Sequence, residues 1–168
     1  MQWIMGFLDW LGETPLSRWI GESFWAFPAL EVVHVFAISM VFGTVVIIDL
    51  RLLGLASTSR RYTAMAHELL PWTWGAFVLA AISGSLLFSS RPVGYFEDKD
   101  FGLKFVLMGL AGVNMLVFHF VTSKHVADWD RGPTPWAAKL AGALSILLWI
   151  GVVYLARMTG FTIVQGGA

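Results

Sequence analysis

The sequence predicts an all-α integral membrane protein, an up-down four-helix bundle with an N-terminal interfacial amphipathic helix. Hydrophobic residues make up 57% of the 168 residues and charged residues only 13%, whereas a soluble domain carries about 25% charged residues. Four apolar stretches approach the roughly 20 residues that a helix needs to cross a bilayer. Because lipid offers no partner to backbone amides, these stretches must be helical, and with no polar face to hydrate they disfavour a soluble helical core.

Residues 1–27 form the first predicted unit, a helical segment in the membrane interface. Apolar residues recur at helical spacing opposite polar ones, which is typical of a helix lying at a lipid surface. The pair Thr14-Pro15 predicts an N-cap followed by the first residue of a second short helix. The segment lacks the basic region and cleavage site of a signal peptide. A flexible leader is the alternative.

Residues 28–160 form the predicted transmembrane domain, and residues 161–168 a short C-terminal tail. Pro28 and Pro71 are placed in first helical turns, where proline is tolerated. Short connectors make neighbouring helices antiparallel, and tryptophans gather near the ends of the spans, as in an interfacial belt. The four predicted spans are Pro28–Ile48, Pro71–Phe88, Leu103–Val121 and Trp136–Ala156.

Small residues recur within the predicted spans, as in Ala138, Gly142 and Ser145. In lipid, such residues let two helix backbones approach closely. We interpret them as packing positions without chemistry.

Composition excludes several classes of function. A formal net charge of zero gives no sign of the excess positive charge that proteins use to bind nucleic acid. The chain has no cysteine, which excludes disulfides, thiolate nucleophiles, iron–sulfur clusters and zinc–thiolate sites. No nucleophile triad, phosphate loop or nucleotide fingerprint occurs, so a self-contained hydrolase or kinase is disfavoured. The polar residues form no continuous file across the membrane, which disfavours an ion path.

Five short sequence motifs are spread along the chain, between about Trp25 and Phe161. They are Glu31-Val-Val-His34, Asp49-Leu-Arg-Leu-Leu-Gly54, Pro71-Trp-Thr-Trp-Gly75, Ala111-Gly-Val-Asn114, and Ala141-Gly-Ala-Leu-Ser145 with Trp149. With these motifs the chain resembles an uncharacterised family of small four-span bacterial inner-membrane proteins, a domain of unknown function. The resemblance implies a four-span protein of the bacterial plasma membrane. It implies no activity and no ligand.

The orientation of the protein in the membrane is only weakly indicated by its charges. Six of the eleven Lys and Arg residues lie on the side that carries the connector between the first and second spans and the connector between the third and fourth spans. Lys and Arg favour cytoplasmic loops. We therefore expect that side to be cytoplasmic and both termini to be periplasmic.

Two histidines form the candidate cofactor site. His67 precedes the second predicted span and His119 lies late in the third, so both are expected near the same face of the membrane. Two neutral imidazoles facing each other across a bundle would suit the iron of a b-type haem. However, a helix that begins at Pro71 would leave His67 in the headgroup region, where a hydrated surface histidine is the simpler interpretation.

Glu31 and His34 are three residues apart and therefore share one helix face. This pair predicts a mononuclear metal site or a quinone-binding pair, and a hydrogen-bonded helix contact is the alternative. His34 lies too far from the other histidines to share their iron. A second haem there would need a partner such as Met158.

Four further polar residues lie in or at the ends of the spans, where ionisable groups are functional candidates by default. For each we favour a structural role. Asp49 and Arg51 are expected to anchor the end of the first span, Lys104 to extend its charge towards the interface, and Asn114 to bridge helices.

Three functions remain open from the sequence. The first is a membrane redox component, either a b-type haem electron carrier or the membrane subunit of a redox complex, with His67 and His119 as ligands and His34 near a quinone. The second is a non-catalytic accessory or anchoring subunit, bound to other membrane subunits or to further copies of itself. The third is a carrier for a small solute or metal ion, centred on Glu31 and His34.

Overall fold

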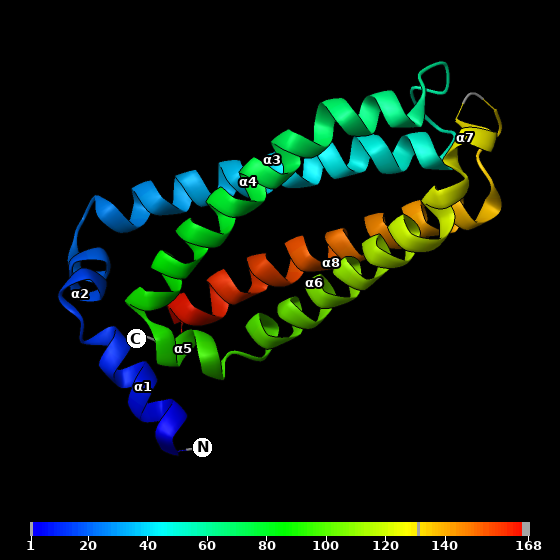
Figure 1. Cartoon of the computed structure of the whole chain (residues 1–168). Coiled ribbons are helices and arrows are strands. Elements are labelled where there is room, and N and C mark those ends of the chain that lie inside the picture. Colours follow the sequence, from blue (N-terminus) through cyan, green and yellow to red (C-terminus); the bar gives the residue numbers. More distant parts are fainter. Residues whose placement is uncertain (1, 131, 166–168) are drawn as a thin grey trace.

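The computed structural model describes residues 2–130 and 132–165, and over these ranges the chain is helical with short connectors and no strand. Two short helices precede the first long helix, and a third lies between the second and third long helices (Figure 1). The elements are α1 (Gln2–Gly12), α2 (Pro15–Glu22), α3 (Ala26–Leu53), α4 (Tyr62–Ser90), α5 (Pro92–Glu97), α6 (Lys99–Val117), the π-helical turn η1 (Phe118–Thr122), the 3₁₀ turn η2 (Ser123–His125), α7 (Val126–Trp129) and α8 (Trp136–Gln165).

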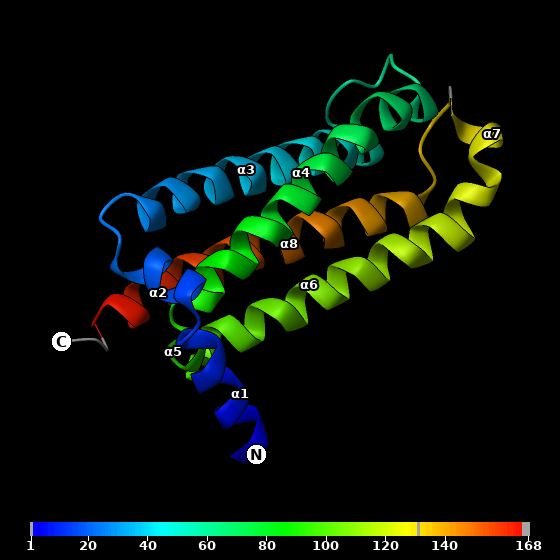
Figure 2. The same ribbon diagram turned by 60° about the vertical axis from the view of Figure 1, so that its left-hand side comes forward.

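Four helices are long and apolar enough to cross a membrane: α3, α4, α6 continued by η1, and α8. This confirms the predicted number of spans. α3 packs along α4, α6 packs along α8, and α3 joins the two pairs by packing on α8. Figures 1 and 2 show the long helices running between two ends of the molecule. We call the end with residues 54–61 and 126–135 the connector end, and the end with α1, α2 and α5 the terminal end.

The predicted start of the second span at Pro71 is wrong. α4 begins at Tyr62, and Pro71 lies inside the helix. The additional turns are held because Met65 and Ala66 are buried there, and because the α7–α8 connector caps the start of the helix, as described below. Neighbouring helices can compensate for the hydrogen bond that a proline removes from a membrane helix. His67 is therefore a residue of α4 and does not precede it.

The connector end holds the largest apolar cluster of the described residues. Leu52 of α3, Trp129 of α7 and Ala138 of α8 are buried together, and Tyr62 and Phe118 pack against them. The ring centroids of Tyr62 and Phe118 are 5.6 Å apart. This cluster fixes the ends of all four long helices relative to one another.

Close approach of α3 and α8 depends on Gly142, as the small-residue pattern predicts. A β-carbon at this position would lie 3.1 Å from the Asp49 carbonyl oxygen and 3.2 Å from the Leu52 Cβ. A side chain here would push the two backbones apart, so glycine sets their spacing.

The two N-terminal helices lie at the terminal end, with α1 beside α5 and α2 beside α4 (Figure 2). Thr14 is the N-cap of α2, as the Thr14-Pro15 pair predicts, and its hydroxyl accepts a hydrogen bond from the Ser17 backbone N–H at 3.3 Å. Several large apolar side chains of this region are exposed: Trp3, Phe7, Trp10, Leu16, Trp19, Phe24 and Trp25.

Candidate functional site

Arg51 is the most deeply buried charged side chain of the described residues, with an exposed fraction of 2%. Its Nε donates to the carbonyl oxygen of Arg60 at 2.7 Å, and its two terminal nitrogens donate to the Thr134 hydroxyl at 3.1 Å and to the Asp130 carbonyl at 3.4 Å. The guanidinium therefore holds both connectors at this end of the bundle. The Arg60 and Glu68 side chains pair with each other at the surface, at 2.7 Å.

Asp130 completes the same network from the α7–α8 connector. Its carboxylate accepts the Thr63 backbone N–H at 2.9 Å and the Thr63 hydroxyl at 2.6 Å. Burial alone would raise the pKa of Asp130, but these two hydrogen bonds and the charges of Arg61 and Arg51 outweigh burial and leave the pKa below its ordinary value. The carboxylate is thus held in its charged form at the first turn of α4.

Asp98 plays a comparable part at the terminal end, as the N-cap of α6. Its carboxylate accepts the Phe101 backbone N–H at 2.6 Å, and it also accepts the hydroxyls of Thr159 and Thr162 from the far end of α8. Burial opposes the charged form, yet the hydrogen bonds from Thr162, Phe101 and Thr159 lower the pKa of Asp98 overall. A carboxylate cap therefore secures the α6–α8 pair where α6 begins.

Asp49 differs from these two aspartates. It is 5% exposed, and its Oδ2 atom is buried without a hydrogen-bond partner among the described residues. The indole Nε1 of Trp129, at 7% exposure, is likewise buried and unpartnered. Buried polar atoms are normally hydrogen-bonded, so each exception requires an explanation.

His34 lies between α3 and α4. Its Nδ1 is 3.0 Å from the Ser83 hydroxyl oxygen, and that hydroxyl donates to the Leu79 carbonyl at 2.7 Å. Because the hydroxyl proton is used there, we assign the Nδ1–H as the donor to Ser83, which leaves Nε2 as an acceptor. A β-carbon at Gly84 would lie 2.8 Å from the His34 Cε1, so the ring fits only because residue 84 is glycine.

Glu31 is exposed, one turn before His34. Among the described residues, no three His, Cys, Asp or Glu side chains gather in a way that could hold a metal ion. The metal or quinone site predicted for Glu31 and His34 therefore stays a prediction, with only one histidine nitrogen free to serve it.

Two other polar side chains join helices within the spans. The Asn114 side-chain amide donates to the Ala141 carbonyl at 2.9 Å, joining α6 to α8. The Thr73 hydroxyl donates to the Thr44 hydroxyl at 2.8 Å, joining α4 to α3. Within the described part of the chain, the Lys104 ammonium makes no interhelical bond of this kind, and it lies 4.2 Å from the centroid of the Phe101 ring, one turn earlier in its own helix.

The two histidines predicted to hold a haem lie towards the same end of the bundle. His119 is adjacent to Phe118, whose ring packs on Tyr62, and His67 follows Tyr62 by about 7.5 Å of helix rise. Both side chains are exposed, and no hydrogen bond in the described part of the chain involves either ring. The structure does not bring the two imidazoles into contact. A haem between them would itself keep them apart, so this arrangement leaves the prediction open.

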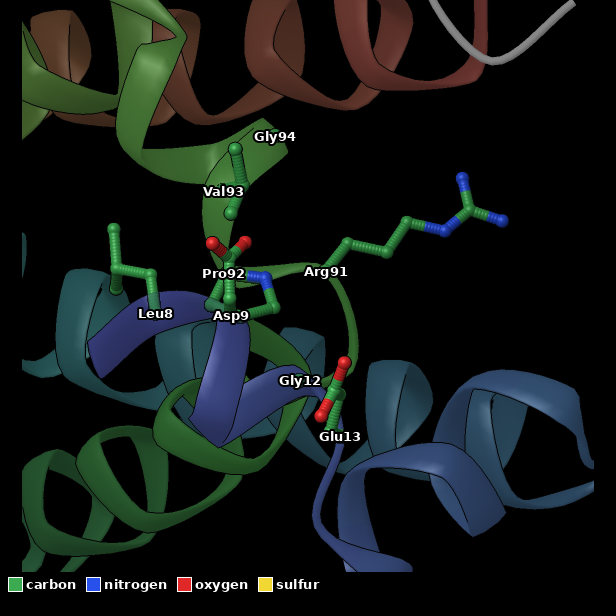
Figure 3. A pocket seen from close by; sticks show the side chains of 8 residues that line it. All are labelled: Leu8, Asp9, Gly12, Glu13, Arg91, Pro92, Val93 and Gly94. Atoms are coloured by element: carbon green, nitrogen blue, oxygen red, sulfur yellow. The ribbon is translucent and has the colours of Figure 1, made fainter. Parts of the chain in front are cut away.

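A shallow hollow of about 350 Å³ lies between α1 and α5. Figure 3 shows the carboxylates of Asp9 and Glu13 at its rim and the Arg91 side chain extending away from them. The two carboxylates are exposed to solvent, where water satisfies them. We assign no ligand to the hollow.

Comparison with family models, with curated proteins and with solved structures found no match. The resemblance to a family of bacterial membrane proteins therefore stays a prediction. What stands is a small membrane protein with four apolar helices.

Sequence reasoning missed several residues of these networks, namely Asp130, Thr63, Thr134 and Ser83. Asp130 stands in a connector with glycine and prolines, where aspartate is an ordinary turn residue. Its partner lies 67 positions earlier, and no local pattern links the two. Gly84 is one of the small residues of the predicted spans, but nothing in the sequence pairs it with His34.

Proposed function

We propose that this chain is a non-catalytic membrane subunit, an up-and-down four-helix anchor of the bacterial inner membrane that assembles with another membrane protein or with further copies of itself. One observation carries the proposal: most polar side chains of the spans are engaged within the chain's own scaffold. His34, Asn114, Thr73 and Arg51 each bond a neighbouring helix or connector. Such bonds stabilise a membrane bundle by about 1 kcal/mol each.

The terminal end supports an anchoring role. The exposed aromatic side chains of α1 and α2 are of the kind that enters the headgroup region of a bilayer. We propose that these two helices lie in the membrane interface, on the periplasmic side by the Lys and Arg bias. Quenching of their tryptophan fluorescence by brominated lipids tests this placement, since helices held in water would not be quenched.

The outer face of α6 is the candidate surface for a partner. Only Ala111 of this helix is buried within the chain. Gly102 and Gly109 are seven residues apart, and a β-carbon at either would meet nothing within 4 Å. Two exposed glycines on one side of a membrane helix allow the backbone of a second helix to approach.

Native mass spectrometry of the protein extracted in mild detergent tests the proposal. We expect a complex of fixed stoichiometry that Gly109→Leu dissociates. Gly75→Leu, at an exposed glycine of α4 with equal space around it, should leave the complex intact. A wild-type protein that is monomeric and partnerless at every detergent concentration would contradict the assembly.

A haem-bearing redox subunit is the second candidate, and one observation favours it. His119 lies in a π-helical turn within a span, and such turns are frequent at functional sites. Exposed, unbonded His67 and His119 have the donor chemistry for the axial ligands of a b-type haem, and His34 would then serve a nearby quinone or metal ion.

An absorption spectrum separates the two candidates. A reduced-minus-oxidised Soret shift that disappears in His119→Ala, and persists in the exposed-carboxyl variant Glu31→Gln, would support the redox function. A colourless protein would leave the anchoring role. The metal content of the wild type against His34→Ala tests the carrier function, which unchanged content would contradict.

A further inference from the structure

The carboxyl group of Asp49 is buried at the contact between α3 and α8. Its helix packs so closely there that a β-carbon at Gly142 would touch the Asp49 backbone. The residue is 5% exposed, and Oδ2 has no hydrogen-bond partner among the described residues. Water has little access to this atom.

Arg51 does not neutralise Asp49. Arg51 is only two residues away, but two apart on a helix means that the side chains point to different faces. Its guanidinium bonds the Arg60 carbonyl, Thr134 and the Asp130 carbonyl. Asp130 carries the same sign as Asp49 and is bonded to Thr63, and the charge of Arg61 acts on Asp130.

The groups around Asp49 are neutral and carry oxygen or N–H. The Ser145 hydroxyl of α8 lies beside the carboxyl group, and Tyr62 of α4 packs against the cluster that contains Leu52, three residues after Asp49. Tyr62 also packs against Trp129, with ring centroids 5.5 Å apart, and the Trp129 Nε1 is the second unpartnered buried atom of the described chain. Two unpartnered polar atoms thus lie in one region, at the junction of α3, α4, α7 and α8.

An unpaired carboxylate in a medium of low dielectric is strongly disfavoured. We propose that Asp49 is a binding site for a small monovalent cation, either a proton or Na⁺, with the hydroxyl oxygen of Ser145 alongside. Both cations neutralise the carboxylate, and hard cations take oxygen ligands of this kind. The site requires neither haem nor a partner protein, so its test is independent of both functions proposed above.

Labelling with dicyclohexylcarbodiimide tests the site. This apolar reagent partitions into micelles and membranes. The O–H of a carboxylic acid adds across one C=N bond of the carbodiimide, with the proton going to nitrogen, and the O-acylisourea so formed rearranges to a stable N-acylurea on the protein. We expect one adduct on the full-length protein in detergent, mapped by peptide mass spectrometry to Asp49. Asp49→Asn should lose the adduct, whereas Asp128→Asn, at an exposed aspartate of the same connector end, should keep it. A water-soluble carbodiimide should label Asp128 and spare Asp49.

The two cations are distinguished by protection. Labelling that slows on addition of NaCl, but not of choline chloride, identifies Na⁺, because bound Na⁺ displaces the reactive proton. A labelling rate that NaCl does not change, and that falls only as the pH is raised, identifies a proton site. If Asp49 stays unlabelled at every pH without Na⁺, or reacts no less with the water-soluble reagent, the proposal is overturned. The wild-type map alone decides this, even where a variant fails to fold.

Discussion

The Asp130 carboxylate caps the first turn of α4 from 67 residues away, through the backbone N–H and the hydroxyl of Thr63. Arg61, the local N-cap residue, makes no side-chain cap of its own. Thr63 is the second residue of the helix, a position whose N–H lacks an intrahelical partner. The connector between the third and fourth spans therefore supplies the cap that the sequence around α4 lacks.

Replacing Asp130 by alanine should destabilise the protein by about 1–2 kcal/mol, the usual loss for an N-cap. The free energy of unfolding in detergent measures it. Asp128→Ala removes an exposed acid from the same connector end and should change stability little. Equal losses in both variants would contradict the cap.

The same carboxylate should give acid sensitivity. Because the folded-state pKa of Asp130 lies below its ordinary value of 3.8, its contribution is complete above about pH 4 and is lost as the pH falls through the lower folded-state pKa. We expect the stability difference between the wild type and Asp130→Asn to shrink over that acidic range. A difference that is constant with pH would show that charge is unimportant there.

Gly84→Ala should separate α3 from α4 by forcing a methyl group against the His34 ring, at a cost of about 1–3 kcal/mol for an overpacked contact. Combining it with His34→Ala should recover most of that loss, because the colliding ring is gone. Unfolding free energies of the two single variants and the double variant form a cycle that measures the coupling. Gly75→Ala in the same helix, with open space around it, serves as the control and should be tolerated.

Arg51→Lys should weaken the packing of the two connectors at the connector end. A lysine ammonium group cannot make the three hydrogen bonds that the planar Arg51 guanidinium donates to oxygens on both connectors. We expect a loss of about 1.5–3 kcal/mol, the range for hydrogen bonds to a charged group, and faster proteolysis in residues 126–135. Arg60→Ala is the matched control. It keeps the backbone carbonyl that Arg51 uses and removes only an exposed ion pair worth at most about 1 kcal/mol.

Gly142→Leu should weaken the α3–α8 contact, since the Asp49 backbone and Leu52 leave no room for a side chain. Gly43→Leu, where a β-carbon would meet nothing within 4 Å, should be nearly neutral. A thermal shift in detergent distinguishes them. Similar midpoints for the two variants would refute the role given to Gly142.

The number of spans and the capped start of α2 were predictable because they follow from local rules. Hydrocarbon thickness sets the length of an apolar helix, and Thr14-Pro15 is a helix start by chemistry that acts within three residues. The start of α4 was not predictable in this way. Proline at position 71 is a local signal for a first turn, and burial of Met65 with a cap from Asp130 overrides it.

The polar contacts also divide into those that local rules predict and those that only helix packing creates. Sequence alone identifies His34, Asn114 and Arg51 as unusual, because polar groups in a span require partners. It does not identify the partners, since Ser83 and Ala141 become neighbours only through helix packing. Asp49 shows the limit most clearly. Its position predicted an anchor near interface water, whereas packing against Gly142 buries it.

The reach of Asp130 and Thr134 back to α3 and α4 has a consequence for biogenesis. A nascent chain that has delivered only its first two long helices to the membrane has neither the partner for Thr63 nor two of the three acceptors for Arg51. That intermediate must wait for roughly forty further residues of synthesis beyond the end of α4, about 2–8 s at ordinary elongation rates, before its first hairpin is locked. During that interval the hairpin is the form most exposed to membrane proteases and chaperones.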